Sequence, residues 1–210
     1  MEDVLSQYEL SYDAKRPVVC FDERPCQLIG DVVQPLPMEP GKIKREDYEY
    51  RRGGVCNLFI AFEPLAGKRI VQVFPHRTGT EYAMFMNTLV NQNYPNSDKV
   101  VIIQDNLNTH TPGSFYTVFN AEHAYALASR FEFHYTPKKA SWLNMAEIEL
   151  SVIAKQCLDH RIADQETLEQ EVFALVEKRN QTCATVHWRF SKINARQKLE
   201  KHYNYTSKLK

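Results

Sequence analysis

Residues 100–105, Val-Val-Ile-Ile-Gln-Asp, are a run of four apolar β-branched residues followed by a glutamine and an acid. The stretch Val-Val-Cys-Phe-Asp-Glu at residues 18–23 has the same design. A short run that is apolar on both faces is typical of a strand covered on both sides in the middle of a sheet. The sequence therefore predicts two such strands, each of which ends at acidic residues.

Further strands and helices are predicted on either side of the 100–105 strand. The segments 55–62 and 69–74 are predicted as strands joined by a hairpin turn, because proline and glycine lie between them. Another strand is expected at 131–135, and helices are expected at 80–91, 115–129, 144–159 and 165–179. This order predicts an α/β fold with a mixed sheet flanked by helices.

The 210 residues suit one main domain, which we expect over residues 17–182. Within it, residues 24–53 are rich in proline and charge and predict a long insertion loop. Residues 1–16 are polar and acidic, as in a lead-in segment, and residues 183–210 form a basic C-terminal tail. The whole chain has 26 basic and 26 acidic residues, so any contact with a polyanion must be local.

The cysteines and the hydropathy indicate a compartment. Five scattered cysteines without a C-x-x-C pair fit neither a disulfide framework nor a zinc module. No run of about 18 apolar residues is present to span a membrane. We therefore expect a reduced, cytoplasmic protein with no membrane partner.

The two strand-end acids, Asp22 and Asp105, are the first candidates for chemistry. Sites in α/β sheets gather at the carboxyl ends of the strands, so parallel neighbours would bring these carboxylates together. Like charges this close repel unless a proton or a cation lies between them, and Mg²⁺ is the usual cation for oxygen ligands. The competing interpretation is that both acids are turn or cap residues. Asn106, which follows the second acid, is an accessory candidate.

A third ligand is sought on the helix expected at 144–159. Helical spacing places Glu147 on the apolar face and Glu149 about 200° away, where it should be solvated. A buried acid needs a partner, which favours Glu147 as a ligand. The alternative is a capping box, because Asn144 and Glu147 have the required N-cap to N3 spacing.

Basic and aromatic residues supply the remaining candidates. His110 suits a proton shuttle or a phosphate contact, although a lone histidine is more often a loop residue. Lysines beside a tryptophan suit phosphate contact and base stacking, whereas surface charge around a half-buried tryptophan is the competing interpretation. Tyr48 and Tyr50, with their flanking arginines, have the same two interpretations. Candidate DNA contacts are Lys138, Lys139, Trp142, Arg51, Arg52, Arg189 and Lys192.

Four motifs together resemble a known family. They are residues 18–23, 57–67, 104–110 and 131–147, and they are similar to the catalytic domain of bacterial insertion-sequence transposases of the mariner-related superfamily, the DDE superfamily endonucleases. This resemblance implies a ribonuclease H-like, or retroviral-integrase-like, fold. It also implies that Asp22, Asp105 and Glu147 are the catalytic and metal-binding triad.

The resemblance further implies metal-dependent cleavage and transfer of DNA strands by two Mg²⁺ ions, for which Mn²⁺ can substitute. The expected partners are double-stranded DNA, as transposon ends and target, and a second copy in a homodimer. Such a protein acts in the bacterial cytoplasm at the nucleoid. Relatives usually carry an N-terminal helix-turn-helix region, so residues 1–16 are expected to follow a missing DNA-binding region. Residues 138–140 read Lys-Lys-Ala where many relatives have Lys-His-Gly.

Two other functions remain open at this point. The chain is alternatively a catalytically silent remnant that binds DNA or dimerises, or a host nuclease of the same fold. Intact acids at all three positions favour an active transposase over a remnant. Inverted repeats in the flanking DNA would separate a transposase from a host nuclease.

Overall fold

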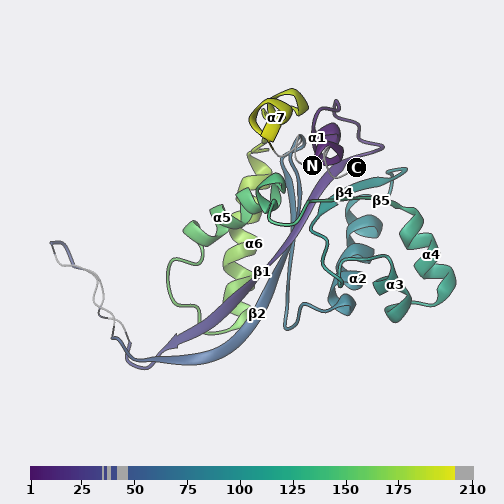
Figure 1. Ribbon diagram of the computed structural model, residues 1–210. Helices are drawn as coiled ribbons and strands as arrows, with labels where there is room; N and C mark the ends of the chain where they lie inside the picture. Colours follow the sequence, from purple (N-terminus) through teal and green to yellow (C-terminus); the bar gives the residue numbers. More distant parts are fainter. Residues whose placement is uncertain (35, 37–38, 42–46, 202–210) are drawn as a thin grey trace.

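The computed structural model describes residues 1–34, 36, 39–41 and 47–201 of the chain. Within these residues, five strands form one mixed sheet with the order β3-β2-β1-β4-β5 (Figure 1). The strands are β1 (Val18–Asp31), β2 (Tyr50–Glu63), β3 (Lys68–Phe74), β4 (Val100–Gln104) and β5 (Phe131–Tyr135). β1, β4 and β5 are parallel, whereas β2 is antiparallel to both of its neighbours. The mixed sheet expected from the sequence is confirmed.

Helices cover both faces of this sheet. α5 and α6 lie on one side, and α2, α3 and α4 lie on the other (Figure 1). The helices are α1 (Glu2–Tyr8), α2 (Gly79–Thr88), α3 (Gly113–Val118), α4 (Ala121–Ser129), α5 (Ala146–Gln156), α6 (Gln165–Gln181) and α7 (Lys192–Lys198). Two short turns of other helix types are η1 (Leu89–Asn93), a π-helix, and η2 (Ser141–Leu143), a 3-10 helix.

The two central strands are buried on both faces, as their apolar runs predict. In β1, Val19 and Phe21 pack under α2, whereas Cys20 faces the core formed with α5 and α6. In β4, Ile102 and Ile103 divide between the same two cores. Successive strand residues point to opposite faces, so a strand between two helical layers needs apolar residues at every position.

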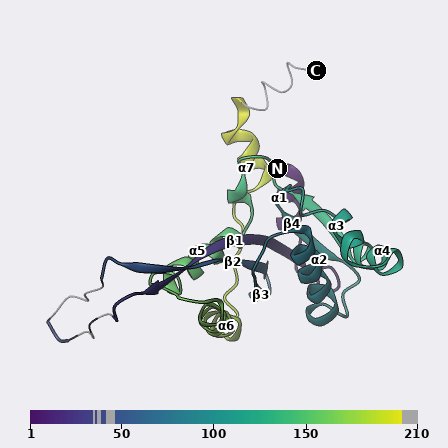
Figure 2. The same cartoon turned by 90° about the horizontal axis from the view of Figure 1, so that it is seen from below.

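The predicted end of the first strand is wrong. β1 continues through Asp22 to Asp31 and pairs with β2 along its whole length, whereas β4 accompanies it only as far as Cys20. The two strands therefore extend from the sheet as a long two-stranded arm (Figures 1 and 2). Pro25 is tolerated there because that part of β1 has one free edge.

The predicted insertion loop, residues 24–53, is therefore mostly strand at both of its ends. Only residues 32–49 lie between β1 and β2. Burial explains the longer strands, because Cys26 and Leu28 of β1 belong to the core shared with α6. The backbone N–H of Ile29 also donates to the carbonyl of Ile162, 2.7 Å away, which ties the arm to the segment before α6.

The helix predicted over 115–129 is two helices. Phe119 and Asn120 have extended backbones, with ψ near 160°, and they separate α3 from α4. Asn120 caps α4, because its side chain accepts a hydrogen bond from the backbone N–H of His123. The other three predicted helices are present with shifted ends.

Two expectations about the whole chain can also be compared with the structure. The five cysteines are all free thiols, as expected, and four of them are buried. None of the helices in the described ranges is long and apolar enough to cross a lipid bilayer.

Candidate active site

Asp22 and Asp105 lie side by side because of the register of two parallel strands. Cys20 of β1 pairs with Ile103 of β4, so the acids two residues further along occupy matching positions. Asp105 follows directly after β4, and Asp22 lies in β1 just beyond the last pair with β4. Asp22 is half-buried, and 38% of the Asp105 side chain is exposed.

Glu147 reaches the same region from the first turn of α5, where it is half-buried. Its effect appears in the pKa of Asp22, which burial raises to about 7, with further contributions from the negative charges of Glu147, Glu23 and Asp105. The backbone N–H of Glu23 donates to Asp22 Oδ1 at 2.9 Å and partly opposes this increase. The three acids expected from the sequence therefore gather around Asp22.

These carboxylates suit a hard divalent cation by their chemistry. A cation would relieve the like-charge repulsion that raises the pKa of Asp22. The ligand geometry itself is not formed, because no three His, Cys, Asp or Glu side chains in the described ranges are arranged to hold a metal ion. Asp22, Asp105 and Glu147 are thus suitable donors that require a local adjustment to share an ion.

Asn144 connects β1 to the start of α5. Its Nδ2 donates to the carbonyl of Phe21 at 2.8 Å and to Asp22 Oδ2 at 3.3 Å. Its Oδ1 accepts from the backbone N–H of Ala146 at 3.1 Å. The capping-box alternative is therefore wrong, because the N-cap of α5 is Met145 and Asn144 Oδ1 accepts from Ala146 rather than from Glu147. The Glu147 carboxylate is left available for another role.

His110 is buried between two carboxylates. Its Nδ1 lies 2.6 Å from Asp105 Oδ1, and its Nε2 lies 3.0 Å from Glu23 Oε2. The ring packs against Phe21 and Tyr82, with centroids 5.2 and 5.0 Å away. Burial lowers the pKa of His110, but the hydrogen bonds to Asp105 and Glu23 outweigh burial and raise it to about 9. His110 does lie in the loop after β4, but it is buried, and its contact with Asp105 orients that carboxylate.

Glu23 is a site residue that the sequence interpretation missed. It follows Asp22 in β1, so its side chain points to the opposite face of the sheet, toward His110. Two sequence features together could have indicated Glu23: side chains alternate between the two faces of a strand, and a histidine lies in the loop after β4. That signal depends on knowing that β1 continues past Asp22.

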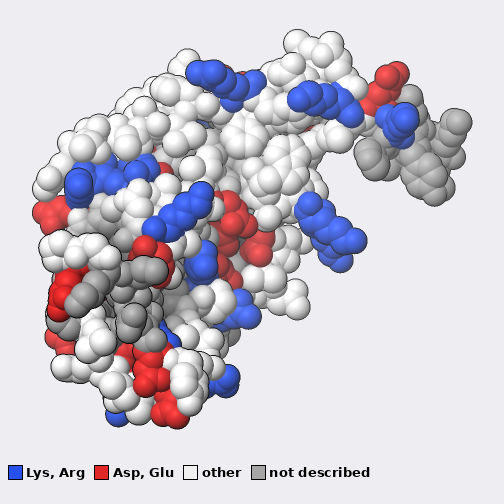
Figure 3. Space-filling model, turned by 90° about the vertical axis from the view of Figure 1, so that its left-hand side faces the viewer, with Lys and Arg blue, Asp and Glu red and all other residues white. Residues whose placement is uncertain are grey.

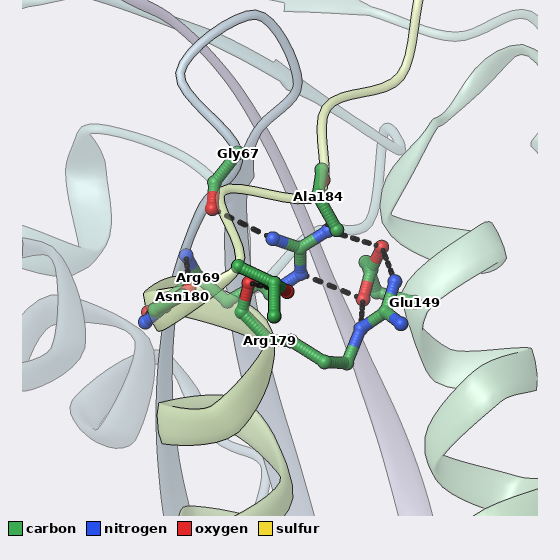
Figure 4. A network of polar contacts seen from close by, with 7 residues as sticks. Gly67, Arg69, Glu149, Arg179, Asn180 and Ala184 are labelled. Carbon is green, nitrogen blue, oxygen red and sulfur yellow. Dashed lines mark hydrogen bonds and ion pairs between the residues drawn. The ribbon is translucent and has the colours of Figure 1, made fainter.

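Glu149 is buried, and the prediction that it is solvated is wrong. Its exposed fraction is 1%, and each of its oxygens accepts hydrogen bonds from two arginines at 2.8 to 2.9 Å (Figure 4). Arg69 comes from β3 and Arg179 from α6. Glu149 lies one helical turn from the core residues Ala146 and Ile153, so it faces these two elements at the edge of the core. Burial raises the pKa of Glu149, but the bonds to Arg69 and Arg179 outweigh it, and the net pKa is lowered.

Arg69 also binds two backbone carbonyls. Its Nη1 donates to Gly67 at 2.7 Å, and its Nη2 donates to Ala184 at 2.5 Å (Figure 4). The network therefore joins the β2–β3 turn, α5, α6 and the segment after α6. By holding Glu149, it fixes the rotation of α5, and the same helix carries Glu147 in its first turn, about 200° around the axis from Glu149.

The candidate DNA contacts differ in how accessible they are. Lys138, Lys139, Trp142 and Arg189 are exposed, and Trp142 precedes Asn144 by two residues. Arg51 and Arg52 are exposed on the arm beside Tyr50, and Tyr48 is 86% exposed near its end. Lys192 is paired with Glu9 at 3.1 Å, so its proposed role competes with an internal contact. Asn106 is exposed beside Asp105.

A cavity of about 390 Å³ lies elsewhere, between the N-terminal segment and the segment before α7. Tyr8, Tyr12 and Trp188 are among the residues that line it, and none of the three acids does. The acids instead lie outside this cavity, where β4 ends beside β1.

Comparisons with known structures identify the fold. The Mos1 strand transfer complex aligns with a TM-score of 0.52 at 14% identity, covering 86% of this chain and 57% of that chain. A pre-cleavage Mos1 transpososome aligns with a TM-score of 0.50 at 13% identity, covering 86% and 58%. The present chain thus spans less than two thirds of either protein, and the likeness confirms the expected ribonuclease H-like fold.

The family comparison agrees with the position of the acids. No curated protein matches the chain. The sequence pattern of the DDE superfamily endonucleases matches residues 17–169, a range that contains all five strands of the sheet and the three acids around Asp22. The chain therefore belongs to the DDE superfamily endonuclease family.

Proposed function

We propose that this chain is the catalytic part of a transposase that cleaves DNA strands and transfers them to a target. The observation that carries the proposal is the gathering of Asp22, Asp105 and Glu147 where β4 ends beside β1. Membership of an endonuclease family supports phosphodiester chemistry, and the Mos1 complexes with the same fold are transposition complexes.

Asp22, Asp105 and Glu147 would hold the metal, which we propose to be two Mg²⁺ ions, replaceable by Mn²⁺. When bound, such ions activate the attacking oxygen and stabilise the leaving oxygen of the phosphodiester. The protein contributes positioning: Asn144 holds Asp22 near the start of α5, and His110 orients the Asp105 carboxylate. The buried Glu149 network keeps α5, and with it Glu147, in one orientation.

The proposed substrate is double-stranded DNA, as transposon ends and as target. Figure 3 shows the molecule from the side on which the arm extends. On this face, Lys and Arg side chains are interspersed with acidic ones and form no continuous basic stripe. Local contacts must therefore position the DNA, and exposed cations such as Arg51, Arg52 and Lys138 are suited to phosphate. We further propose a homodimer that acts on chromosomal DNA in the bacterial cytoplasm, at the nucleoid.

Cleavage of supercoiled plasmid tests this function. The chain should nick the plasmid in Mg²⁺ or Mn²⁺ and not in EDTA, and Asp105→Asn should abolish nicking. The melting temperature of Asp105→Asn should be measured alongside, because the substitution relieves the like-charge repulsion on Asp22 but also removes the charge that faces His110. Glu177→Gln, on the exposed side of α6, is the matched control and should cleave normally. Equal nicking by Asp105→Asn would exclude the proposed site, and no nicking by any form would favour the silent DNA-binding remnant.

A further inference from the structure

Trp142 is a half-exposed tryptophan that is held in place by other rings. It lies in η2 and is 49% exposed. Trp188 stacks on it with centroids 6.3 Å apart and planes 18° apart, and Phe190 meets it edge-on at 5.7 Å. No other aromatic ring of the described ranges contacts Trp142. The exposed part of the indole is therefore open to another flat group.

The rings that support Trp142 are fixed by hydrogen bonds. Trp188 Nε1 donates to the carbonyl of Phe190 at 2.8 Å. Tyr8 packs against Trp188 at 5.2 Å, and its hydroxyl donates to the carbonyl of Leu143 at 2.7 Å. The stack is thereby tied back to the turn that carries Trp142. A surface that is already ordered loses little conformational entropy when it binds a ligand.

Basic residues flank this stack along the chain. Lys138 and Lys139 precede η2, Arg189 follows Trp188, and all three are exposed. None of the three forms an ion pair with another residue in the part of the chain that the structure describes. Lys198 Nζ lies 5.7 Å from the Phe190 ring centroid. Unpaired cations around an aromatic face match a ligand with phosphates and a flat base.

The stack is also close to the candidate active site along the chain. Trp142 lies two residues before Asn144, whose amide is 3.3 Å from Asp22 Oδ2, and five residues before Glu147. An internal base of a duplex has both faces covered by its neighbours, so away from the duplex ends only an unstacked base offers a face to an indole. We propose that Trp142 stacks one unpaired DNA base. The proposal rests on the proposed function for its choice of DNA, but it concerns binding alone.

Intrinsic fluorescence provides a direct test. The chain has only two tryptophans, and both belong to this stack. Trp188→Phe leaves Trp142 as the single reporter and keeps an aromatic support beneath it. Titration with a short single-stranded oligonucleotide in EDTA should quench this emission, and a duplex without overhangs should not. Equal quenching by the blunt duplex would overturn the assignment to an unpaired base.

Affinity measurements separate stacking from general attraction. By fluorescence anisotropy of a labelled oligonucleotide, Trp142→Ala should weaken binding about tenfold, within the range known for base–aromatic stacking, and Trp142→Phe should retain most of it. Tyr125→Ala is the matched control, since Tyr125 is 70% exposed on α4, and its affinity should be unchanged. Equal weakening by both alanine variants, or none by Trp142→Ala, would overturn the proposal.

The same protein samples distinguish the two proposals. Asp105→Asn should bind and quench like the parent while failing to nick plasmid. If the parent nicks plasmid and Trp142 shows no quenching, the stacking proposal fails and the proposed function stands. If quenching is present and no form nicks in Mg²⁺ or Mn²⁺, stacking stands and the proposed function fails.

Discussion

Replacing Glu149 by glutamine should strongly destabilise the fold, because it leaves a buried arginine without its counter-charge. Glu149 is 1% exposed and accepts hydrogen bonds from Arg69 and Arg179 through both oxygens. Glutamine has nearly the same shape, but its amide NH₂ would face guanidinium donors. Arg69, which is 2% exposed, would keep only the carbonyls of Gly67 and Ala184.

The expected magnitude follows from the burial of each partner. Breaking a buried ion pair by removing one partner typically costs about 3 to 5 kcal/mol. We expect the lower end, about 3 kcal/mol, because the Arg179 side chain is 22% exposed and regains water. In a chain of this length, such a loss lowers the melting temperature by roughly 6 to 12 °C.

Urea unfolding followed by circular dichroism measures this loss. Glu177→Gln, exposed on the neighbouring α6, should change the free energy of unfolding by no more than about 0.5 kcal/mol. The lowered pKa of Glu149 means that its contribution is present above about pH 4 and is lost as pH falls through the folded pKa. The difference between parent and Glu149→Gln should therefore shrink in acid. A loss as small as that of the control would refute the buried network and the orientation of α5 that depends on it.

Three further predictions concern the acids and the residues that hold them. His110 has a pKa of about 9 in the folded chain, above its unfolded value near 6.5. Its stabilising contribution is therefore complete below about pH 6.5 and is lost as pH rises to 9. Urea titrations at a series of pH values should show this decline in the free energy of unfolding for the parent but not for His110→Gln. The same decline in both proteins would contradict the ion pairs of His110 with Asp105 and Glu23. Asn144→Ala should lower the rate of Mg²⁺-dependent nicking by about 10- to 100-fold, as is usual when a residue that orients a metal ligand is removed. The control Asn91→Ala, at an exposed position of η1, should nick like the parent. Equal nicking rates of the two variants would exclude a role of Asn144 in positioning Asp22. Asp22 has a raised pKa of about 7, so its ionisation destabilises the fold as pH rises through 7. Asp22→Asn should therefore melt at a higher temperature than the parent at pH 8 in EDTA, but not at pH 4. Identical melting curves of the two proteins at both pH values would contradict the crowding of carboxylates around Asp22.

The approximate positions of the strands could be predicted from the sequence, because each apolar run is a local pattern. The apolar runs at 18–21 and 100–103 could only be accommodated between two helical layers, and parallel pairing then brought Asp22 and Asp105 together. The long arm could not be predicted, because β1 beyond Asp22 is polar and proline-containing and is stabilised by its pairing with β2.

The environment of individual acids was harder to predict. Helical periodicity shows which residues of α5 share a face, but it does not show which other elements pack against that face. It therefore could not reveal that Arg69 of β3 and Arg179 of α6 bind Glu149. The contact between His110 and Glu23 joins residues 87 positions apart, and no local pattern links them. The Asn144 capping box was also not formed, because α5 begins one residue later than the spacing required, and Asn144 Oδ1 accepts from Ala146 instead of Glu147.

The most direct test of the central claim is a crystal structure of the chain soaked in Mn²⁺, with anomalous scattering used to locate the metal. We predict an anomalous peak bound by carboxylate oxygens of both Asp22 and Asp105, with Glu147 turned toward the same site. The Asp105→Asn crystal, treated in the same way, should show a weaker peak or none. The absence of a peak in the parent, with the Asp22 and Asp105 carboxylates too far apart to share an ion, would contradict the assignment of these acids as the metal-binding site.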